Sequence, residues 1–275
     1  MESLTGKLQK LIAYLEGLGS AAVAFSGGVD SSFMLRTAHD VLGEKAVAFT
    51  FDTVFSPKKE KAEAEEFCKR YGIRLETVSF DILSEERIAA NPADRCYLCK
   101  KKMFGLLIKR ASESGFEYVL DGSNVDDEGD YRPGLKALAE LGVKSPLRYA
   151  GFTKSDIRTL SKEMGLPSWD KPSLACLASR FAYGEKITEE KLKAVENSEE
   201  LIKGYGIKQV RVRVHGDIAR IEVEKSDIGM FKGSDISELV CKYLKGSGFS
   251  YVTLDLEGYR TGSMNVNLND KKSAT

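Results

Sequence analysis

The chain has 275 residues, and its 41 Lys and Arg residues balance its 41 Asp and Glu residues. This length allows one large domain or two, with a substantial hydrophobic core. The zero net charge argues against a globally basic nucleic-acid-binding protein, so we expect no nucleic-acid partner. No apolar run approaches the length of a membrane span, and no membrane partner is expected either.

The five cysteines bear on the cellular compartment. The first residues, Met1 to Gly6, include no basic segment ahead of an apolar one, so the sequence predicts no signal peptide. In a protein that is not exported, cysteines are expected to be reduced thiols, metal ligands or catalytic groups. We therefore expect a cytoplasmic location.

The first predicted elements surround a glycine turn. A leucine-rich helical stripe runs from Leu4 to Leu18, and residues 21–25 are small and apolar, which predicts a buried strand. Ser26-Gly27-Gly28 interrupts the strand, and residues 33–42 then follow with helical spacing. Adjacent glycines let the backbone approach a ligand closely, and the helix N-terminus favours an anion. The sequence therefore predicts an anion site between strand and helix.

The side chains of this turn refine the prediction. Serine hydroxyls add hydrogen-bond donors, and Asp30 would suit Mg²⁺ accompanying phosphates. No Lys-Ser/Thr pair follows the glycines, which excludes a Walker A loop. The segment instead resembles the PP-loop of the N-type ATP pyrophosphatases, which cleave ATP between its α and β phosphates. That resemblance implies bound ATP and Mg²⁺, with the loop residues Ser26, Gly27, Gly28, Val29, Asp30, Ser31 and Ser32 as ligands.

The next elements alternate between strand and helix. Strands are predicted at 46–51, 75–80 and 118–120, and a short extended segment at Pro146-Leu147. Helices are predicted at about 57–71, with Ser56 as the expected cap, at 81–88, in a segment that ends near 112, and at 153–165. This alternation favours an α/β fold with a doubly wound parallel sheet. Phe51 lies at the carboxyl end of one predicted strand and Gly122 follows another, where such sheets bind ligands, so both are candidate nucleotide contacts.

The pattern changes near Phe181. Helices are predicted at 189–203 and 235–244, and strands at 209–214, 218–223 and 251–256. We therefore expect a PP-loop domain at 1–180 and a smaller α+β domain at 181–275, for substrate binding or oligomerisation. Arg211 and Arg213 alternate along one strand and so share a face, where they suit a phosphate or carboxylate. A solvated strand edge is the alternative interpretation.

Three cysteines form a candidate metal site. Cys96-x-x-Cys99 alone is compatible with a redox dithiol, half of a zinc site or part of an iron–sulfur site. Cys176, in a loop of small residues, adds a third thiol, and three thiolates can hold a [4Fe-4S] cluster with one iron open. The alternative is that Cys96 and Cys99 are exposed loop thiols and Cys176 is buried. Basic residues neighbour these cysteines in the chain: Arg95, Lys100, Lys101, Lys102 and Arg180.

Together the motifs resemble the LarE family, ATP-dependent sulfur transferases of nickel-pincer nucleotide synthesis. The resemblance extends over nearly the whole chain. It rests on the PP-loop, Asn91-Pro-x-Asp-Arg-Cys96-Tyr-x-Cys-Lys100, Asp121-Gly-Ser-Asn-x-Asp-Asp127, Arg132-Pro-Gly, Pro172-Ser-Leu-Ala-Cys-Leu-Ala-Ser-Arg180, Arg211-Val-Arg213 and Gly258-Tyr-Arg-Thr-Gly-Ser-Met-Asn265.

This resemblance implies a reaction. ATP would adenylate a carboxylate of pyridinium-3,5-biscarboxylic acid mononucleotide, and sulfur would then displace AMP to give a thiocarboxylate. In one form of the family the cysteine at position 176 gives up its own sulfur; in the other, three cysteines hold a [4Fe-4S] cluster. Cys96 and Cys99 favour the cluster form, with the sulfur donor unknown. The resemblance further implies a hexamer, catalytic Cys176, Asp30 and Lys101, and binding roles for Arg180, Arg211 and Arg213.

Three other classes of protein remain open at this point. A tRNA-thiolating PP-loop enzyme would also combine ATP with cysteines, although it should carry a basic surface or an RNA-binding appendage. An amidating enzyme such as an NAD synthetase needs no trio of cysteines. A non-catalytic nucleotide or metal carrier would bind ATP without releasing pyrophosphate.

Overall fold

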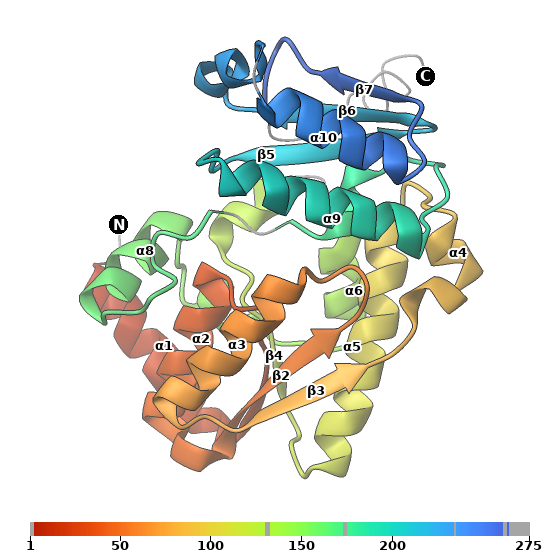
Figure 1. Cartoon of the computed structure of the whole chain (residues 1–275). Helices are drawn as coiled ribbons and strands as arrows, with labels where there is room; N and C mark the ends of the chain where they lie inside the picture. Colours follow the sequence, from red (N-terminus) through yellow and green to blue (C-terminus); the bar gives the residue numbers. More distant parts are fainter. Residues whose placement is uncertain (1–2, 130–132, 173–174, 234, 261–262, 264–275) are drawn as a thin grey trace. The chain divides into compact units, whose positions relative to one another are not determined.

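The computed structural model describes residues 3–129, 133–172, 175–233, 235–260 and 263 (Figure 1). Contacts divide the chain into two compact units. The first consists of Met1–Phe80 and Cys96–Leu174, and the second of Asp81–Arg95 and Ala175–Thr275. The division therefore falls at 174/175, and it adds the segment 81–95 to the second unit. The domain boundary expected at 180/181 stays a prediction.

The first unit is built on a parallel sheet with strand order β3-β2-β1-β4. Its strands are β1 Ala21–Ala24, β2 Ala46–Asp52, β3 Leu75–Ser79 and β4 Val119–Leu120. In register, Ala21 is opposite Ala46, and Val23 is opposite Leu120. This sheet confirms the predicted α/β class and brings the carboxyl ends of β1, β2 and β4 to one edge.

Helices cover both faces of this sheet (Figure 1). They are α1 Leu4–Leu18, α2 Val29–Leu42, α3 Lys58–Tyr71, α5 Arg95–Glu113, α6 Pro133–Glu140, α7 Pro146–Tyr149 and α8 Lys154–Glu163, with 3₁₀ turns at Gly43–Lys45 and Val125–Gly129. Val23 and Ala48 pack with α1, α2, α3 and α8, whereas Ala22 and Phe49 pack with α5 and α6. Successive side chains of a strand point to opposite faces, so a sheet covered twice requires the unbroken apolar runs seen in the sequence.

Two local expectations and one alternative were wrong. Helix α3 begins after Pro57 without a side-chain cap, so Ser56 does not cap it. Residues 146–149 form the short helix α7 rather than an extended segment, because proline at the first helical position fixes a helical φ and lacks only an N–H that would be unpaired anyway. Cys96 and Cys99 lie in the first turns of α5, which contradicts the alternative that they are loop thiols.

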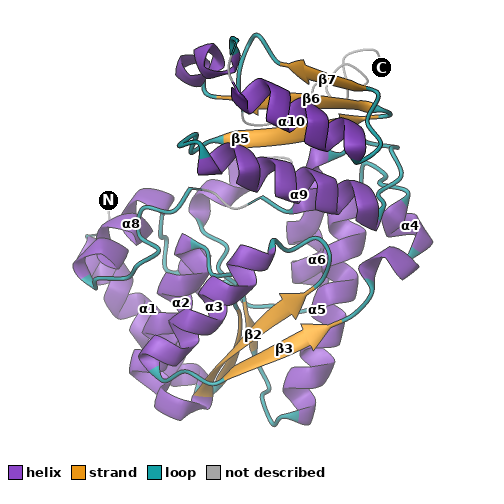
Figure 2. Ribbon diagram, viewed as in Figure 1, coloured by secondary structure: helices purple, strands orange, loops and turns teal. Residues whose placement is uncertain are grey.

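The second unit contains a smaller sheet of order β5-β6-β7. Strands β5 Val210–His215 and β6 Ile218–Val223 are antiparallel, and β7 Tyr251–Leu254 runs parallel to β6. Helices α9 Glu189–Gly204 and α10 Asp235–Gly246 lie side by side against this sheet (Figure 2). The short helix α4 Glu86–Ala89 and the 3₁₀ segments Ile82–Ser84, Leu177–Arg180 and Lys225–Phe231 complete the unit. A smaller C-terminal α+β part is thereby confirmed.

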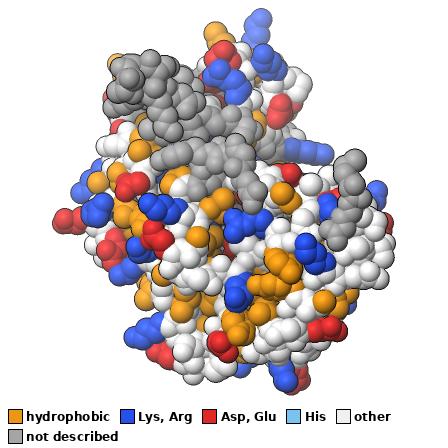
Figure 3. All heavy atoms as spheres, turned by 180° about the vertical axis from the view of Figure 1, so that it is seen from behind, with side chains coloured by type: hydrophobic (Ala, Val, Ile, Leu, Met, Phe, Trp, Pro, Cys, Tyr) orange, Lys and Arg blue, Asp and Glu red, His pale blue; other side chains and the backbone are white. Residues whose placement is uncertain are grey.

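The described surface carries charges of both signs. Figure 3 shows Lys and Arg side chains scattered among Asp, Glu and hydrophobic side chains over the face that it displays. Within the described part of the chain, no helix is both long enough and apolar enough to cross a membrane.

Candidate nucleotide and anion sites

The loop between β1 and α2 folds back over the first turn of the helix. Gly27 has a φ of 72°, in the left-handed region that favours glycine, and Gly28 is the N-cap of α2. The hydroxyl of Ser31 accepts a hydrogen bond from the amide of Ser26 at 3.3 Å and donates to the carbonyl oxygen of Gly28 at 3.2 Å. The closed loop thus lies at the N-terminus of α2, where the sequence predicts an anion site.

Polar atoms at the loop are buried without protein partners. Oδ1 of Asp30, Oγ of Ser32 and Oδ1 of Asp121 have no hydrogen-bond partner among the described residues. Each such atom costs about 1–3 kcal/mol when it is left unsatisfied, so native proteins rarely leave several near one another. Oxygen atoms of carboxylates and hydroxyls are the ligands that Mg²⁺ prefers, which makes the donor set suitable for a metal–nucleotide complex.

Gly122 brings the end of β4 against this loop. A Cβ at position 122 would lie 3.0 Å from the amide nitrogen of Ser31 and 3.3 Å from the carbonyl carbon of Asp30. Glycine therefore allows the close approach of the two backbone segments. The structure gives Gly122 a packing contact with the predicted nucleotide loop.

Lys154 is a member of the site that the sequence analysis missed. Its ammonium donates a hydrogen bond to Oδ2 of Asp30 from the first position of α8. Burial raises the pKa of Asp30, and the hydrogen bond and charge of Lys154 oppose that rise. The capping box of Thr153 and Asp156, visible in the sequence, correctly marks the start of this helix. Nothing local indicates that the next residue reaches Asp30.

Lys171 is a second missed cation. Its ammonium lies 3.2 Å from the carbonyl oxygen of Gly27 and 2.8 Å from Oε2 of Glu63. Lys154 and Lys171, both late in the sequence of the first unit, thus contact Asp30 and the glycine loop, respectively. Either ammonium is able to turn and bind a phosphate, since it stands on a flexible side chain with rotatable donors.

A pocket of about 120 Å³ lies beside the loop. It is lined by Phe25, Ser26, Thr50, Phe51, Ser56, Glu60, Lys61 and Met103. Apolar rings with a few polar groups suit a flat, partly polar base, and two predicted site residues, Ser26 and Phe51, line this pocket together. Sγ of Cys99 is 3.3 Å from Sδ of Met103, so this cysteine is one side chain away from the pocket lining.

Lys101, predicted to be catalytic, belongs to an exposed cluster with Tyr97 and Glu140. Its ammonium donates to the Tyr97 hydroxyl and to Glu140 Oε2, at 2.9 Å each. The hydrogen bond with Tyr97, then that with Glu140, raises the pKa of Lys101. Lys101 therefore carries a positive charge at neutral pH and is a poor general base.

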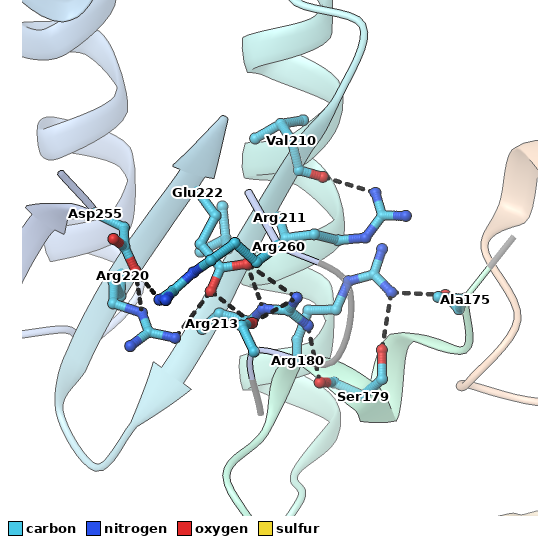
Figure 4. Close-up of polar contacts among 12 residues, drawn as sticks. Ala175, Ser179, Arg180, Val210, Arg211, Arg213, Arg220, Glu222, Asp255 and Arg260 are labelled. Atoms are coloured by element: carbon cyan, nitrogen blue, oxygen red, sulfur yellow. Dashed lines mark hydrogen bonds and ion pairs between the residues drawn. The ribbon is translucent and has the colours of Figure 1, made fainter. Parts of the chain in front are cut away.

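Arginines and carboxylates gather on the sheet of the second unit (Figure 4). Arg180 makes two hydrogen bonds of 2.9 Å to Glu199, and both side chains are buried. Arg213 donates to Glu222 at 3.0 Å, and Arg220 reaches the other oxygen of this fully buried carboxylate at 2.8 Å. These contacts contradict the alternative of a solvated strand edge.

Arg211 differs from its neighbours. Its guanidinium donates to the carbonyl oxygen of Val210 at 2.7 Å and lies over the ring of Tyr259, yet no described carboxylate forms an ion pair with it. Only 8% of the residue is exposed. Burial, and then the charge of Arg180, lowers the pKa of Arg211. A buried cation without a paired anion is costly, which indicates a place for an anionic ligand.

The candidate cluster ligands come from both units. Cys96 is exposed and Cys99 half-buried on α5, three positions apart and hence on one helix face, and Cys176 is exposed in the loop before Leu177–Arg180. The exposure contradicts the alternative of a buried Cys176. Within the described ranges, no three Cys, His, Asp or Glu side chains are already grouped to hold a metal ion. Cys68 is buried, which raises its pKa to about 12, so it is an unreactive thiol.

The parallel sheet, the closed glycine loop ahead of α2 and the adjoining pocket define a nucleotide-binding domain of the PP-loop ATP pyrophosphatase class. The sequence profile described as NAD synthase matches residues 3–94, which include this loop. A subunit of the glutamine-hydrolysing GMP synthase of Thermoplasma volcanium is 28% identical over 189 residues, 63% of this chain and 60% of the relative.

Two relatives match almost end to end. An uncharacterised Synechocystis protein is 42% identical over 263 residues, covering 95% of this chain and 98% of the relative. The pyridinium-3,5-bisthiocarboxylic acid mononucleotide synthase of Lactiplantibacillus plantarum is 39% identical over 276 residues, covering 100% of this chain and 99% of the relative. The chain belongs to the LarE family of ATP-dependent sulfurtransferases.

Proposed function

We propose that this protein converts a carboxylate of pyridinium-3,5-biscarboxylic acid mononucleotide into a thiocarboxylate in two steps. The carboxylate first attacks the α-phosphorus of ATP, forming an acyl adenylate and releasing pyrophosphate. Sulfide sulfur then attacks the acyl carbon, and AMP leaves. A carboxylate is a poor electrophile, and AMP is a far better leaving group than oxide, so adenylation makes the second step feasible. Family membership supports this reaction.

Asp30 carries the ATP-dependent half of the proposal. Its unpartnered Oδ1 would bind the Mg²⁺ that accompanies the phosphates. The amides of residues 26–32 and the N-terminus of α2 would stabilise the departing pyrophosphate, and Lys154 and Lys171 would add positive charge. The pocket bordered by Phe51 would receive the adenine.

The second unit would bind the substrate. Arg211 and Arg213 share one face of β5, and Arg180, predicted to bind as well, is paired with Glu199 beside them. A guanidinium binds a phosphate with two parallel hydrogen bonds, so the mononucleotide phosphate is the natural ligand for Arg211. Lys101 lies on α5 of the first unit, where it would serve as a fixed positive charge, in keeping with its raised pKa.

Cys96, Cys99 and Cys176 would hold a [4Fe-4S] cluster. All three thiols belong to exposed or half-buried residues and lie in the motifs that carry the family resemblance, whereas Cys68 is buried in the core. Thiolates are the usual ligands of such clusters, so the donor set fits. When bound, the cluster would supply an open iron able to carry sulfide. The alternative is that Cys176 gives up its own sulfur.

Anaerobic purification followed by absorbance spectra and iron and sulfide analysis tests this proposal. We expect oxygen to bleach the protein and abolish thiocarboxylate formation, while pyrophosphate release persists. Intact mass after a single turnover separates the two sulfur sources, because a sacrificial cysteine becomes dehydroalanine and loses about 34 Da, the mass of H₂S. That loss at Cys176, with Cys96 and Cys99 dispensable, would contradict the cluster. Failure to release pyrophosphate with the pyridinium mononucleotide would contradict the reaction itself.

The proposal includes a cytoplasmic hexamer, as the family resemblance implies. Light scattering coupled to size-exclusion chromatography measures the assembly directly. A monomer at micromolar concentration would contradict this part of the proposal and leave the chemistry untouched.

A further inference from the structure

The backbone on both sides of Cys176 is held by buried side chains of the second unit. Arg180 donates from Nη1 to the carbonyl oxygens of Ala175 at 2.6 Å and Cys176 at 3.2 Å. The guanidinium thus bonds directly to the carbonyl of the cysteine itself. The Cys176 side chain, by contrast, belongs to an exposed residue.

Arg180 is itself held in place by Glu199. Nε and Nη2 each donate to a different oxygen of Glu199 at 2.9 Å, and the two side chains are each 4% exposed. Glu199 also accepts from the amide of Val212 at 2.9 Å, which ties it to β5. Most donors of Arg180 are therefore committed to protein atoms, an arrangement that suits support of the loop better than binding of a ligand.

A second pair of side chains holds the residues that follow. Arg95 donates to the carbonyl oxygen of Ala178 at 2.8 Å and to Oδ1 of Asn91. Asn91 donates from Nδ2 to the carbonyl oxygens of Ala182 at 2.7 Å and Phe181 at 3.3 Å. Asn91 is fully buried and Arg95 is 4% exposed.

Asn91 is also held in an uncommon backbone conformation. Its φ of 54° is the only positive value among the non-glycine residues that the structure describes. Such a conformation is unfavourable for a residue with a side chain and persists where the surroundings fix it. Here the side-chain amide donates to two carbonyl oxygens, those of Phe181 and Ala182.

Three side chains therefore satisfy five carbonyl groups between residues 175 and 182. Three of these carbonyl groups also accept a backbone amide, from Ser179, Phe181 and Glu185, so buried side chains add to the segment's own backbone hydrogen bonds. A reacting group needs its position fixed closely, because a displacement of about 1 Å can slow a reaction about 100-fold. The Cys176 loop has this kind of support.

We propose that Asn91, Arg95 and Arg180, the last backed by Glu199, are positioning residues that fix the Cys176 thiol for sulfur transfer. This inference rests on the proposed function of Cys176. It gives the Asn91-Pro-x-Asp-Arg95 part of the sequence motif a task separate from nucleotide binding. None of the four side chains acts on the reacting atoms; each acts through the backbone of residues 175–182.

The two half-reactions test the proposal. Asn91→Gly is compatible with the positive φ and removes the whole side chain, including the Oδ1 that accepts from Arg95, and Arg95→Met removes the guanidinium while keeping most of the length of the stem. We expect kcat for thiocarboxylate formation to fall about 10- to 100-fold in both, with unchanged KM for the mononucleotide and unchanged pyrophosphate release. Arg95→Lys, which retains a donor, should recover part of the loss. Ser198→Ala removes a buried hydroxyl from α9 next to Glu199 in the chain, one that bonds the carbonyl oxygen of Ala194 within the same helix, and should change neither rate.

Two results would overturn the proposal. Equal losses of pyrophosphate release and sulfur transfer would indicate a general structural role, and unchanged kcat in Asn91→Gly and Arg95→Met would remove the positioning role. If Arg95→Met does not fold, Asn91→Gly and Arg95→Lys provide the same comparison. Thiocarboxylate formation by Cys176→Ala would instead overturn the proposed function of Cys176 itself, and the positioning role with it.

Discussion

The carboxylate of Asp30, in the first turn of α2, is hydrogen-bonded on one side only. Oδ2 accepts from the ammonium of Lys154, and Oδ1 is buried without a partner among the described residues. An aspartate beside a phosphate loop would repel an anion, so the unpartnered oxygen is best explained by a cation that arrives with the nucleotide. Lys154 and Mg²⁺ would then share one carboxylate.

Asp30→Asn keeps the shape of this side chain and removes its charge. We expect pyrophosphate release to fall at least about 100-fold, the scale seen when a charge-stabilising group is removed from an active site. Asp40→Asn is the matched control, because Asp40 lies on the same helix in an exposed pair with Arg36. Normal pyrophosphate release by a folded Asp30→Asn protein would exclude Asp30 from the mechanism.

Lys154→Met tests the second half of the pair. Loss of a charged hydrogen bond to phosphate should weaken ATP binding or its transition state by about 1–3 kcal/mol. Steady-state kinetics of pyrophosphate release would show this as a higher KM for ATP or a lower kcat. Lys162→Met, on the exposed part of α8 over the ring of Trp169, should leave both constants unchanged. Equal effects of the two substitutions would point to a general loss of charge.

Substitution of Arg211 should affect substrate binding, whereas substitution of Arg213 should affect stability. Arg211→Met removes a buried cation that pairs with no carboxylate of the described chain, so the free energy of unfolding should hold or rise while mononucleotide binding weakens by about 1–3 kcal/mol. ATP binding should not change. Urea unfolding and calorimetric titration measure the two quantities. A parallel loss of ATP affinity would place Arg211 in the nucleotide pocket instead.

Arg213→Met, unlike Arg211→Met, should lower the free energy of unfolding. It removes one of two arginines that pair with the fully buried Glu222, and leaving a buried charge underpaired costs about 3–5 kcal/mol. We therefore expect a clear drop in the urea midpoint for Arg213→Met and none for Arg211→Met. Equal stability of the two variants would contradict the distinction between paired and unpaired arginines.

The Arg180–Glu199 pair predicts a pH dependence of stability. Burial alone would raise the pKa of Glu199, but the hydrogen bond and charge of Arg180 more than offset it, so the pKa is lowered. Because the folded pKa lies below that of the unfolded chain, the stabilisation is complete above the ordinary glutamate pKa of about 4.3 and is lost as the pH falls through the folded value.

Glu199→Gln should remove this dependence. At about pH 7 we expect the variant to be less stable by about 3–5 kcal/mol, and the gap to wild type should narrow toward about pH 3. Glu200→Gln, in the adjacent exposed pair with Lys203, is the control and should change stability little. Urea unfolding across this range measures both. A constant gap at every pH would show that the charge of Glu199 is not the source of the stabilisation.

Local sequence patterns determined much of this protein. The glycine loop between an apolar strand and a helix, the capping box at Thr153, and the shared face of Arg211 and Arg213 all depend on residues within a few positions of one another. Helix and strand periodicities and short-range hydrogen bonds are set at that distance, so they can be inferred from the chain alone.

Only the tertiary structure decided which distant groups meet. Lys154 and Asp30 are 124 positions apart, and Arg95 and Ala178 are 83 apart. Arg213 pairs with a described carboxylate, and Arg211 does not. This difference depends on the register of β5 against β6 and on the direction that each side chain takes from its strand. Such contacts follow from strand order and packing, which bring together residues whose sequence neighbours give no sign of one another.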